Sequence, residues 1–153
     1  MTKFDFKDGN GPVPAHRHRN GGGWVANSAT VNATAFVSNT AWVFDNAQVS
    51  DNARVSGTAW VSGTAWVSGN AQVFGTAQVS GPITTVTRTD GYTFLVTPCA
   101  DGVRRVLAGC RYFTREEAVE HWTRTRGGTP LGKETLRIVD FLFGLEKTHA
   151  IHK

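Results

Sequence analysis

An uninterrupted six-residue repeat constrains the fold of this chain more than any other feature of its sequence. Alanine recurs at every sixth position from Ala29 to Ala77, and a valine follows each alanine two residues later, from Val31 to Val79. Side chains alternate across a β-strand, so each alanine shares one face with its valine. A turn such as Asp45-Asn46 ends each short strand. The chain must therefore coil, and stacked coils must share an interior of alanine and valine.

This run of nine hexads closely resembles the hexapeptide-repeat family, whose fold is a left-handed parallel β-helix with three hexads in each triangular coil. The resemblance implies about three coils within residues 25–82. It also supplies the handedness, because the general rule for parallel crossover connections favours the opposite hand. At a strand spacing of about 4.8 Å the stack is only about 14 Å tall, so we expect caps at both ends.

Three hexads per coil would align the outward residues of successive coils in columns. Trp42 is then expected directly above Trp60, and Phe44 and Phe74 are expected to face outward. So many outward rings are unusual on a soluble monomer; either the chain's own C-terminal module covers them or, as we favour, a second subunit does. Members of the family are usually trimers, which favours a homotrimer. The residues predicted at its interface are Phe36, Trp42, Trp60 and Trp66.

Residues 1–24 are expected to form an N-terminal arm that caps the first coil. Residues 9–23 are too rich in glycine and proline for a helix. In extended geometry His16 and His18 would share one face, and Arg17 and Arg19 the other. Three interpretations stay open: a solvated basic arm, a site for an anionic ligand, and a metal site. The metal site is the least favoured, because two histidines without a nearby cysteine or carboxylate are a poor ligand set.

After residue 82 the hexad pattern stops, and residues 83–153 are expected to form a small α+β module. Alternating and β-branched residues predict strands at Ile83–Arg88, Tyr92–Thr97 and Val103–Ala108. Turn residues separate these segments, which favours a three-stranded antiparallel meander.

Two helices are predicted after this meander. A capping-box pattern at Thr114 opens the first, which should end near Gly127, and a broad apolar face predicts the second over residues 133–146. The fold class is therefore mainly β: a short left-handed parallel β-helix followed by a small α+β module. Such a small module should dock on the coils.

The sequence also bears on cellular location. Cys99 and Cys110 lie at opposite ends of the third predicted strand and its turn, about 20 Å apart and beyond disulfide reach. This spacing favours a reducing compartment. No apolar run is long enough to span a bilayer, and residues 1–10 lack the apolar core of a signal peptide. A cytoplasmic location without a membrane partner is expected.

Enzymatic function is the less favoured interpretation. In the acyltransferases of the family, a histidine in or beside the coils acts as general base, whereas Ala29–Ser80 contains no histidine. The same observation disfavours the zinc-dependent carbonic anhydrases of the family. We therefore expect no catalytic residue, cofactor or metal, with acyl transfer from acetyl-coenzyme A as the alternative. All the histidines lie in the flanks, at His16, His18, His121, His149 and His152.

The flanks carry most of the arginines, interleaved with aromatic residues, and this pattern favours anion binding. Arginine offers forked donors to phosphate, and rings offer faces to bases. A helix N-terminus at Thr114 would add free amides. Pairing of an arginine with a nearby glutamate is an equally weighted alternative for each position. The net charge is only +4 without a polybasic tail, so no long nucleic acid is expected as a partner. The predicted ligand-binding residues are His16, Arg17, His18, Arg19, Tyr92, Arg111, Tyr112, His121, Arg124 and Arg126.

The leader HRHRNGGGWV, the short hexad run and the tail GCRYF…EEAVEHW together resemble small hexapeptide-repeat proteins encoded by phages and prophages. This resemblance implies a virus-encoded accessory protein in the host bacterial cytoplasm. Our hypothesis is a non-enzymatic homotrimer that sequesters a small phosphorylated, nucleotide-like ligand of the host's defence. An acyltransferase and a scaffold for protein partners are the alternatives.

Overall fold

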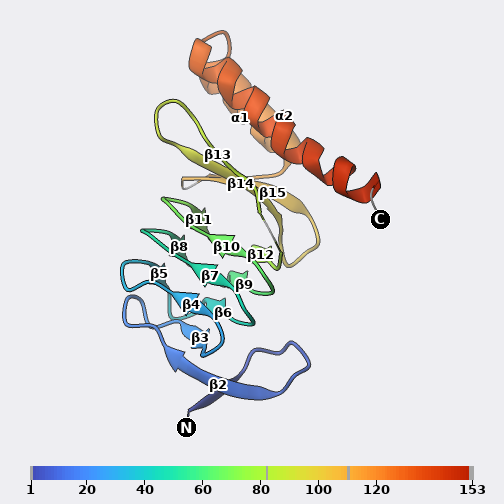
Figure 1. Cartoon of the computed structure of the whole chain (residues 1–153). Coiled ribbons are helices and arrows are strands. Elements are labelled where there is room, and N and C mark those ends of the chain that lie inside the picture. Colours follow the sequence, from blue (N-terminus) through green and yellow to red (C-terminus); the bar gives the residue numbers. More distant parts are fainter. Residues whose placement is uncertain (1, 82, 110, 152–153) are drawn as a thin grey trace.

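The computed structural model describes residues 2–81, 83–109 and 111–151, and it divides the chain along one axis (Figure 1). A coiled segment occupies the middle. An N-terminal hairpin closes one end, and an antiparallel sheet followed by two helices covers the other. The expected separation of Cys99 from Cys110 lies outside the described residues, since Cys110 is not among them.

Short strands in the middle segment pair in parallel with strands one coil away, and they form three faces. The first face contains β3 (Trp24–Ala26), β6 (Trp42–Val43), β9 (Trp60–Val61) and β12 (Gln78–Val79). The second contains β4 (Thr30–Val31), β7 (Gln48–Val49) and β10 (Trp66–Val67). The third contains β5 (Phe36–Val37), β8 (Arg54–Val55) and β11 (Gln72–Val73). The predicted β-solenoid of about three turns is confirmed.

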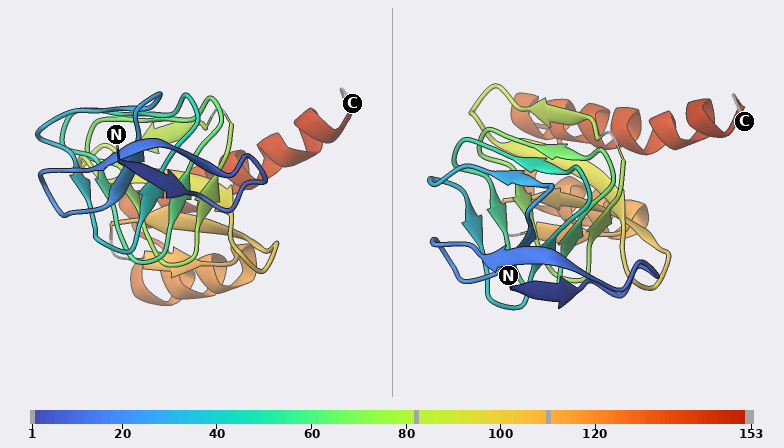
Figure 2. Two further views of the ribbon diagram at one scale, coloured as in Figure 1. Left: turned by 90° about the horizontal axis from the view of Figure 1, so that it is seen from below. Right: turned by 60° about the horizontal axis from the view of Figure 1, so that its bottom comes forward.

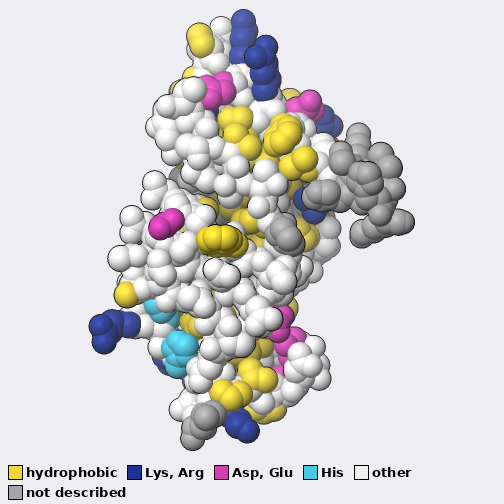
Figure 3. Space-filling view, viewed as in Figure 1, with side chains coloured by type: hydrophobic (Ala, Val, Ile, Leu, Met, Phe, Trp, Pro, Cys, Tyr) yellow, Lys and Arg dark blue, Asp and Glu magenta, His cyan; other side chains and the backbone are white. Residues whose placement is uncertain are grey.

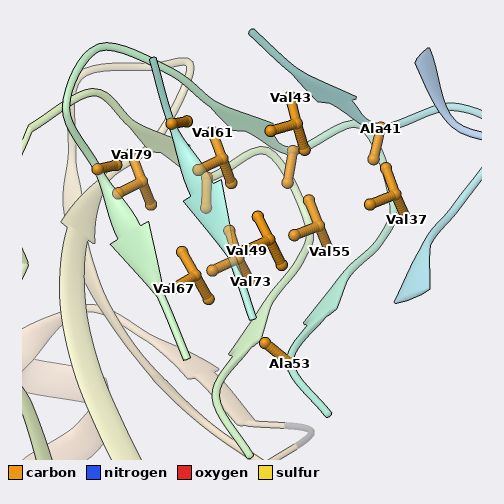
Figure 4. Close-up of a cluster of buried hydrophobic side chains, with 14 of the residues drawn as sticks. Val37, Ala41, Val43, Val49, Ala53, Val55, Val61, Val67, Val73 and Val79 are labelled. Carbon is orange, nitrogen blue, oxygen red and sulfur yellow. The ribbon is translucent and has the colours of Figure 1, made fainter. Parts of the chain in front are cut away.

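The alanines and valines of the repeat line the interior of the solenoid (Figure 4). From Ala35 to Val79 each of these side chains is almost completely buried. Val61 lies between Val43 and Val79, its register partners on the neighbouring coils. Burial of each valine contributes about 1.5–3 kcal/mol, so the repeat itself supplies the hydrophobic core of the coils.

In the turns from residue 45 to residue 75, one residue of each hexad lies in the left-handed region. Asp45 and Asp51 occupy this position with φ of 56°, and glycine occupies it in the later hexads, as at Gly63 and Gly69. Aspartate tolerates this conformation better than most residues, and glycine adopts it freely. The Asp45 carboxylate accepts a hydrogen bond from the Gly63 amide at 3.1 Å, and Asp51 accepts one from Gly69 at 3.0 Å. The aspartates therefore also join neighbouring coils.

The C-terminal sheet has four strands where the sequence predicted three. Its order is β13 (Thr85–Thr87), β14 (Thr93–Pro98), β15 (Arg104–Ala108) and β16 (Arg111–Phe113). The added strand β16 pairs with β15, and Gly109 before it has a φ of +55° that suits a tight reversal. Helix α1 spans Arg115–Arg126, and α2 spans Pro130–Ile151, longer than the predicted second helix.

This sheet docks on the last coil, as its small size required. Leu95 and Leu107 complete the alanine and valine core from one face of the sheet. On the other face, Phe94 and Val106 pack with residues of both helices, such as Trp122. The sheet is therefore a layer between the solenoid and the helices (Figure 1).

The N-terminal hairpin covers the tryptophans of the first face. Strands β1 (Lys3–Asp5) and β2 (Pro12–Arg17) pair in antiparallel fashion, and β2 then pairs with β3 across the end of the coils (Figure 2). Phe4 stacks on Trp24 at 4.6 Å, and Phe6 stacks on Phe44 at 4.9 Å between ring centroids. These outward rings are thus covered from the N-terminal side, whereas Phe74 contacts Tyr112 of the C-terminal sheet.

Candidate anion-binding site

A pocket of about 280 Å³ lies at the edge of the C-terminal layer, between the β13–β14 turn, strand β16 and helix α1. It brings together four of the residues that the sequence indicated as ligand-binding: Tyr92, Arg111, His121 and Arg126. Its lining consists of Arg88, Tyr92, Arg111, His121, Trp122, Thr125 and Arg126.

Arg88 forms a fixed wall of the pocket, and its role was missed in the sequence. Its guanidinium donates to both carboxylate oxygens of Asp90, at 2.8 and 2.6 Å, and to Thr135 Oγ1 at 2.9 Å. These bonds from Arg88 lower the pKa of Asp90 to about 2. The pair therefore has no net charge at neutral pH. The only sequence signal for this ion pair is that Arg88 and Asp90 lie two positions apart, just before the turn residue Gly91.

Arg111 and Arg126 are the two cations of the pocket whose guanidinium groups are available to a ligand. Both side chains are exposed. Within the described part of the chain neither forms an ion pair, whereas Arg124 on the same helix pairs with Glu120 at 3.5 Å. Arg124, which was also predicted as ligand-binding, does not line the pocket. Two guanidinium groups thus present donors that an anion can accept.

His121 lies among these arginines and beside two aromatic rings. Its ring centroid is 4.9 Å from that of Phe113 and 5.6 Å from that of Trp122. Burial lowers the pKa of His121, and the positive charges of Arg111, Arg124 and Arg126 lower it further. Both effects favour the neutral form of the imidazole.

The aromatic residues around the pocket provide mostly structural support. Trp122 is buried and contacts Phe94 at 5.5 Å between ring centroids. Tyr92 is half-buried, with the Arg88 guanidinium 4.9 Å from its ring centroid. A side chain on Gly109 would collide with the Tyr92 hydroxyl, so Tyr92 is held against the backbone there. The partly exposed rings available to a ligand are those of Tyr92 and His121.

A capping box engages two of the amides at the N-terminus of α1, where the sequence suggested free amides. Thr114 Oγ1 accepts from the Glu117 amide at 3.3 Å, and a Glu117 carboxylate oxygen accepts from the Thr114 amide at 2.9 Å. The helix therefore satisfies part of its own N-terminus. Tyr112 is likewise engaged, because its hydroxyl lies 2.8 Å from Thr76 Oγ1 on the last coil.

The histidine arm lies at the far end of the molecule from this pocket. Figure 3 shows histidine side chains, with Lys and Arg side chains beside them, along the lower part of the molecule, and another group of Lys and Arg side chains on the helical layer above. His18 is 7% exposed, and its Nε2 donates to the Ala35 carbonyl at 2.7 Å. His16 contacts Asn27, and Arg17 lies over Trp24 at 4.4 Å while Arg19 is exposed. The structure therefore separates the predicted ligand-binding residues into two distant groups.

The residues predicted at a subunit interface have different environments. Trp42 and Trp60 are half-buried beside the N-terminal hairpin, and the Arg54 guanidinium covers Phe36 at 4.4 Å. Trp66 is 59% exposed on the second face, where its indole donates to Ser50 Oγ at 3.2 Å.

Neither a metal centre nor a membrane span is visible in the part of the chain that the structure describes. No three histidine, cysteine, aspartate or glutamate side chains there lie close enough together to hold a metal ion. None of the helices there combines the length and apolar character needed to cross a membrane. Comparison of the chain with protein-family models, curated proteins and solved structures found no match.

Proposed function

We propose that this chain is a non-enzymatic binding protein that holds a small phosphorylated ligand in the pocket of Arg88, Tyr92, Arg111, His121 and Arg126. The observation that supports the proposal is the meeting of Arg111 and Arg126 in one pocket, without ion-pair partners among the described residues. Arginine pairs with phosphate through two parallel hydrogen bonds, so two free guanidinium groups favour this ligand class.

Binding without catalysis fits the composition of the pocket better than acyl transfer does. The lining offers donors to an anion, and its one candidate general base is His121. The coils contain no histidine, although in related enzymes of this architecture the base sits in or beside them.

The proposed biological role is sequestration of a nucleotide-like signal. The resemblance to small phage-encoded hexapeptide-repeat proteins supports a virus-encoded protein that removes such a signal of the host's defence in the bacterial cytoplasm. Tyr92 and His121 are the partly exposed rings against which a base would lie.

We also propose that the protein is a homotrimer assembled through the coils. The first face is covered by the chain's own hairpin, but Trp66 on the second face is 59% exposed. Burial of this ring against a neighbouring subunit would remove a large apolar side chain from water.

A ligand screen with matched variants tests the function. Purified protein is titrated with mono- and cyclic nucleotides, and unfolding temperature is recorded. A ligand at 100 times its Kd adds about 2.7 kcal/mol to the free energy of unfolding, so a clear rise in Tm is expected. The variants Arg111→Gln and Arg126→Gln should abolish this rise. Arg115→Gln removes a charge from the same helix outside the pocket and should retain it.

The other functions give different results in the same preparation. A flat response to every phosphorylated compound would contradict ligand sequestration and favour the scaffold. Release of free coenzyme A from acetyl-coenzyme A in the presence of amine or hydroxyl acceptors would instead favour the acyltransferase.

A further inference from the structure

The charges around the pocket do not balance within the chain. Arg88 is neutralised by Asp90, with which it shares two hydrogen bonds. Arg124 is paired with Glu120 across one helical turn. Two positive charges remain, on Arg111 and Arg126, and neither has an ion-pair partner in the described residues. A ligand that neutralises the pocket therefore carries two negative charges.

On the basis of the proposed function, we propose that this pocket selects a terminal phosphate monoester over a phosphodiester. His121 takes up a proton when the monoester binds. A phosphate monoester carries a charge of −1.5 to −2 at pH 7 and offers three terminal oxygens. A phosphodiester carries a single charge and offers two such oxygens. Both ligands offer enough oxygens to reach Arg111 and Arg126, but only the monoester carries enough negative charge to neutralise the two guanidinium groups.

His121 is placed to respond to this charge. It lies on α1 between the paired residues Glu120 and Arg124 and close to Arg126, and β16 contributes Arg111. From the β13–β14 turn the pocket receives Arg88, which Asp90 neutralises. Burial lowers the pKa of the free imidazole below its ordinary value, and the positive charges of the arginines lower it further.

A bound dianion reverses this influence. It neutralises the arginines and stabilises imidazolium, so the pKa of His121 rises on binding. For the dianionic form of the monoester, affinity is then highest below the pKa of His121 in the free protein. It falls as the pH rises through the pKa of the bound state, because the neutral ring no longer donates from both nitrogens.

The first test compares two adenosine ligands, one with a terminal phosphate monoester and one in which the phosphate is also esterified to the 3′-hydroxyl. Isothermal titration at pH 7 is carried out with adenosine 5′-monophosphate and with adenosine 3′,5′-cyclic monophosphate. The monophosphate is expected to bind at least about tenfold more tightly, since its second negative charge strengthens the hydrogen bonds from the two arginines. Arg111→Gln and Arg126→Gln should each remove most of this preference.

The second test measures the proton uptake that accompanies binding of the monophosphate. Between pH 6.5 and 8.0 the monophosphate should lose about three- to tenfold in affinity. The dianionic fraction of the ligand itself rises over this range, which acts in the opposite direction. Titrations in buffers of different ionisation enthalpy should show proton uptake by the wild-type protein, and His121→Gln should abolish both the uptake and the pH-dependent loss.

The outcomes separate this inference from the function on which it rests. Equal or tighter binding of the cyclic compound would overturn the selection while leaving ligand sequestration standing. Binding of the monophosphate without proton uptake would overturn the role of His121. If neither compound binds, and inorganic phosphate does not bind either, the inference and the proposed function are both wrong.

Discussion

The indole of Trp42 lies face to face with the indole of Trp60, with ring centroids 5.3 Å apart and planes 5° apart. The two residues are register partners on strands β6 and β9 of neighbouring coils. Phe4 and Phe6 of the N-terminal hairpin meet Trp42 edge-on, at 5.2 and 6.0 Å. One aromatic cluster therefore joins two coils to their cap.

Loss of this stack should destabilise the fold. Trp60→Ala removes a half-buried ring that contacts Trp42 and Phe44, and it should lower the free energy of unfolding by about 2–4 kcal/mol. Urea unfolding followed by circular dichroism measures the change. The control Gln48→Ala alters an exposed residue of the coils and should stay within about 0.5 kcal/mol. Equal losses in both variants would contradict a stabilising stack.

Two glycines in equivalent turns provide a matched test of coil packing. Gly63 and Gly69 have φ of +60° and +61°, so alanine at either position costs about 1 kcal/mol in backbone strain. A Cβ on Gly63 would also collide with the Ser80 carbonyl, whereas none of the surrounding atoms lies within 4 Å at Gly69. Gly63→Ala should therefore lower Tm by clearly more than Gly69→Ala does. Similar Tm values for the two variants would show that the Ser80 segment moves freely.

The Arg88–Asp90 pair should make the protein sensitive to acid. Hydrogen bonds from Arg88 hold the pKa of Asp90 at about 2 in the folded state, below its ordinary value near 4. A carboxylate whose pKa is lowered in the folded state stabilises the fold at pH values above its pKa in the unfolded chain. This stabilisation is lost as the pH falls toward 2. Wild-type Tm should thus fall more steeply between pH 4 and 2 than that of Asp90→Asn. Parallel pH profiles would argue against the pair.

Trp66 provides a test of the proposed assembly. Light scattering of the wild-type protein should give about three times the 16.6 kDa mass of the chain, and Trp66→Glu should shift it toward one chain. Lys133→Glu changes a surface charge on α2, far along the chain from the coils, and should retain the wild-type mass. A wild-type monomer would contradict the trimer.

Two substitutions in the histidine arm distinguish a structural role from ligand binding. His18→Ala removes the bond to the Ala35 carbonyl and should lower the free energy of unfolding by about 1–2 kcal/mol. Arg19→Ala alters an exposed side chain and should change stability by less than about 0.5 kcal/mol. Nucleotide affinity should be unchanged in both. A loss of affinity in Arg19→Ala would move the ligand site to this arm.

Much of the coiled segment follows from the sequence alone. The spacing of alanine and valine predicted the buried lining, and the coil of three hexads implied by the family resemblance placed Trp42 over Trp60. The capping box at Thr114 is equally local, and it begins α1 as predicted. Each of these features depends on residues a few positions apart or on a strict period, so short-range sterics and burial determine it.

The sequence alone did not predict the fourth strand of the C-terminal sheet or the hairpin that covers the tryptophans, because both depend on contacts between distant segments. Strand β16 is only three residues long and gains its partner from β15 after a reversal. Phe4 and Phe6 reach the tryptophan column only because β2 pairs with β3 across the end of the coils. A short strand or hairpin has little stability by itself, so its place depends on the surface it meets.

The amino-acid order is enough to show that the chain coils, which residues line the coils and that the arginines are concentrated in the flanks. Which of those arginines meet depends on how the segments pack. Arg88, Arg111 and Arg126 come from three separate segments, and the packing of α1 on the sheet brings them to one pocket. Asp90 and Glu120 meanwhile neutralise Arg88 and Arg124. A periodic core is encoded locally, whereas the charge of a pocket depends on contacts between distant segments and on which of its side chains form ion pairs.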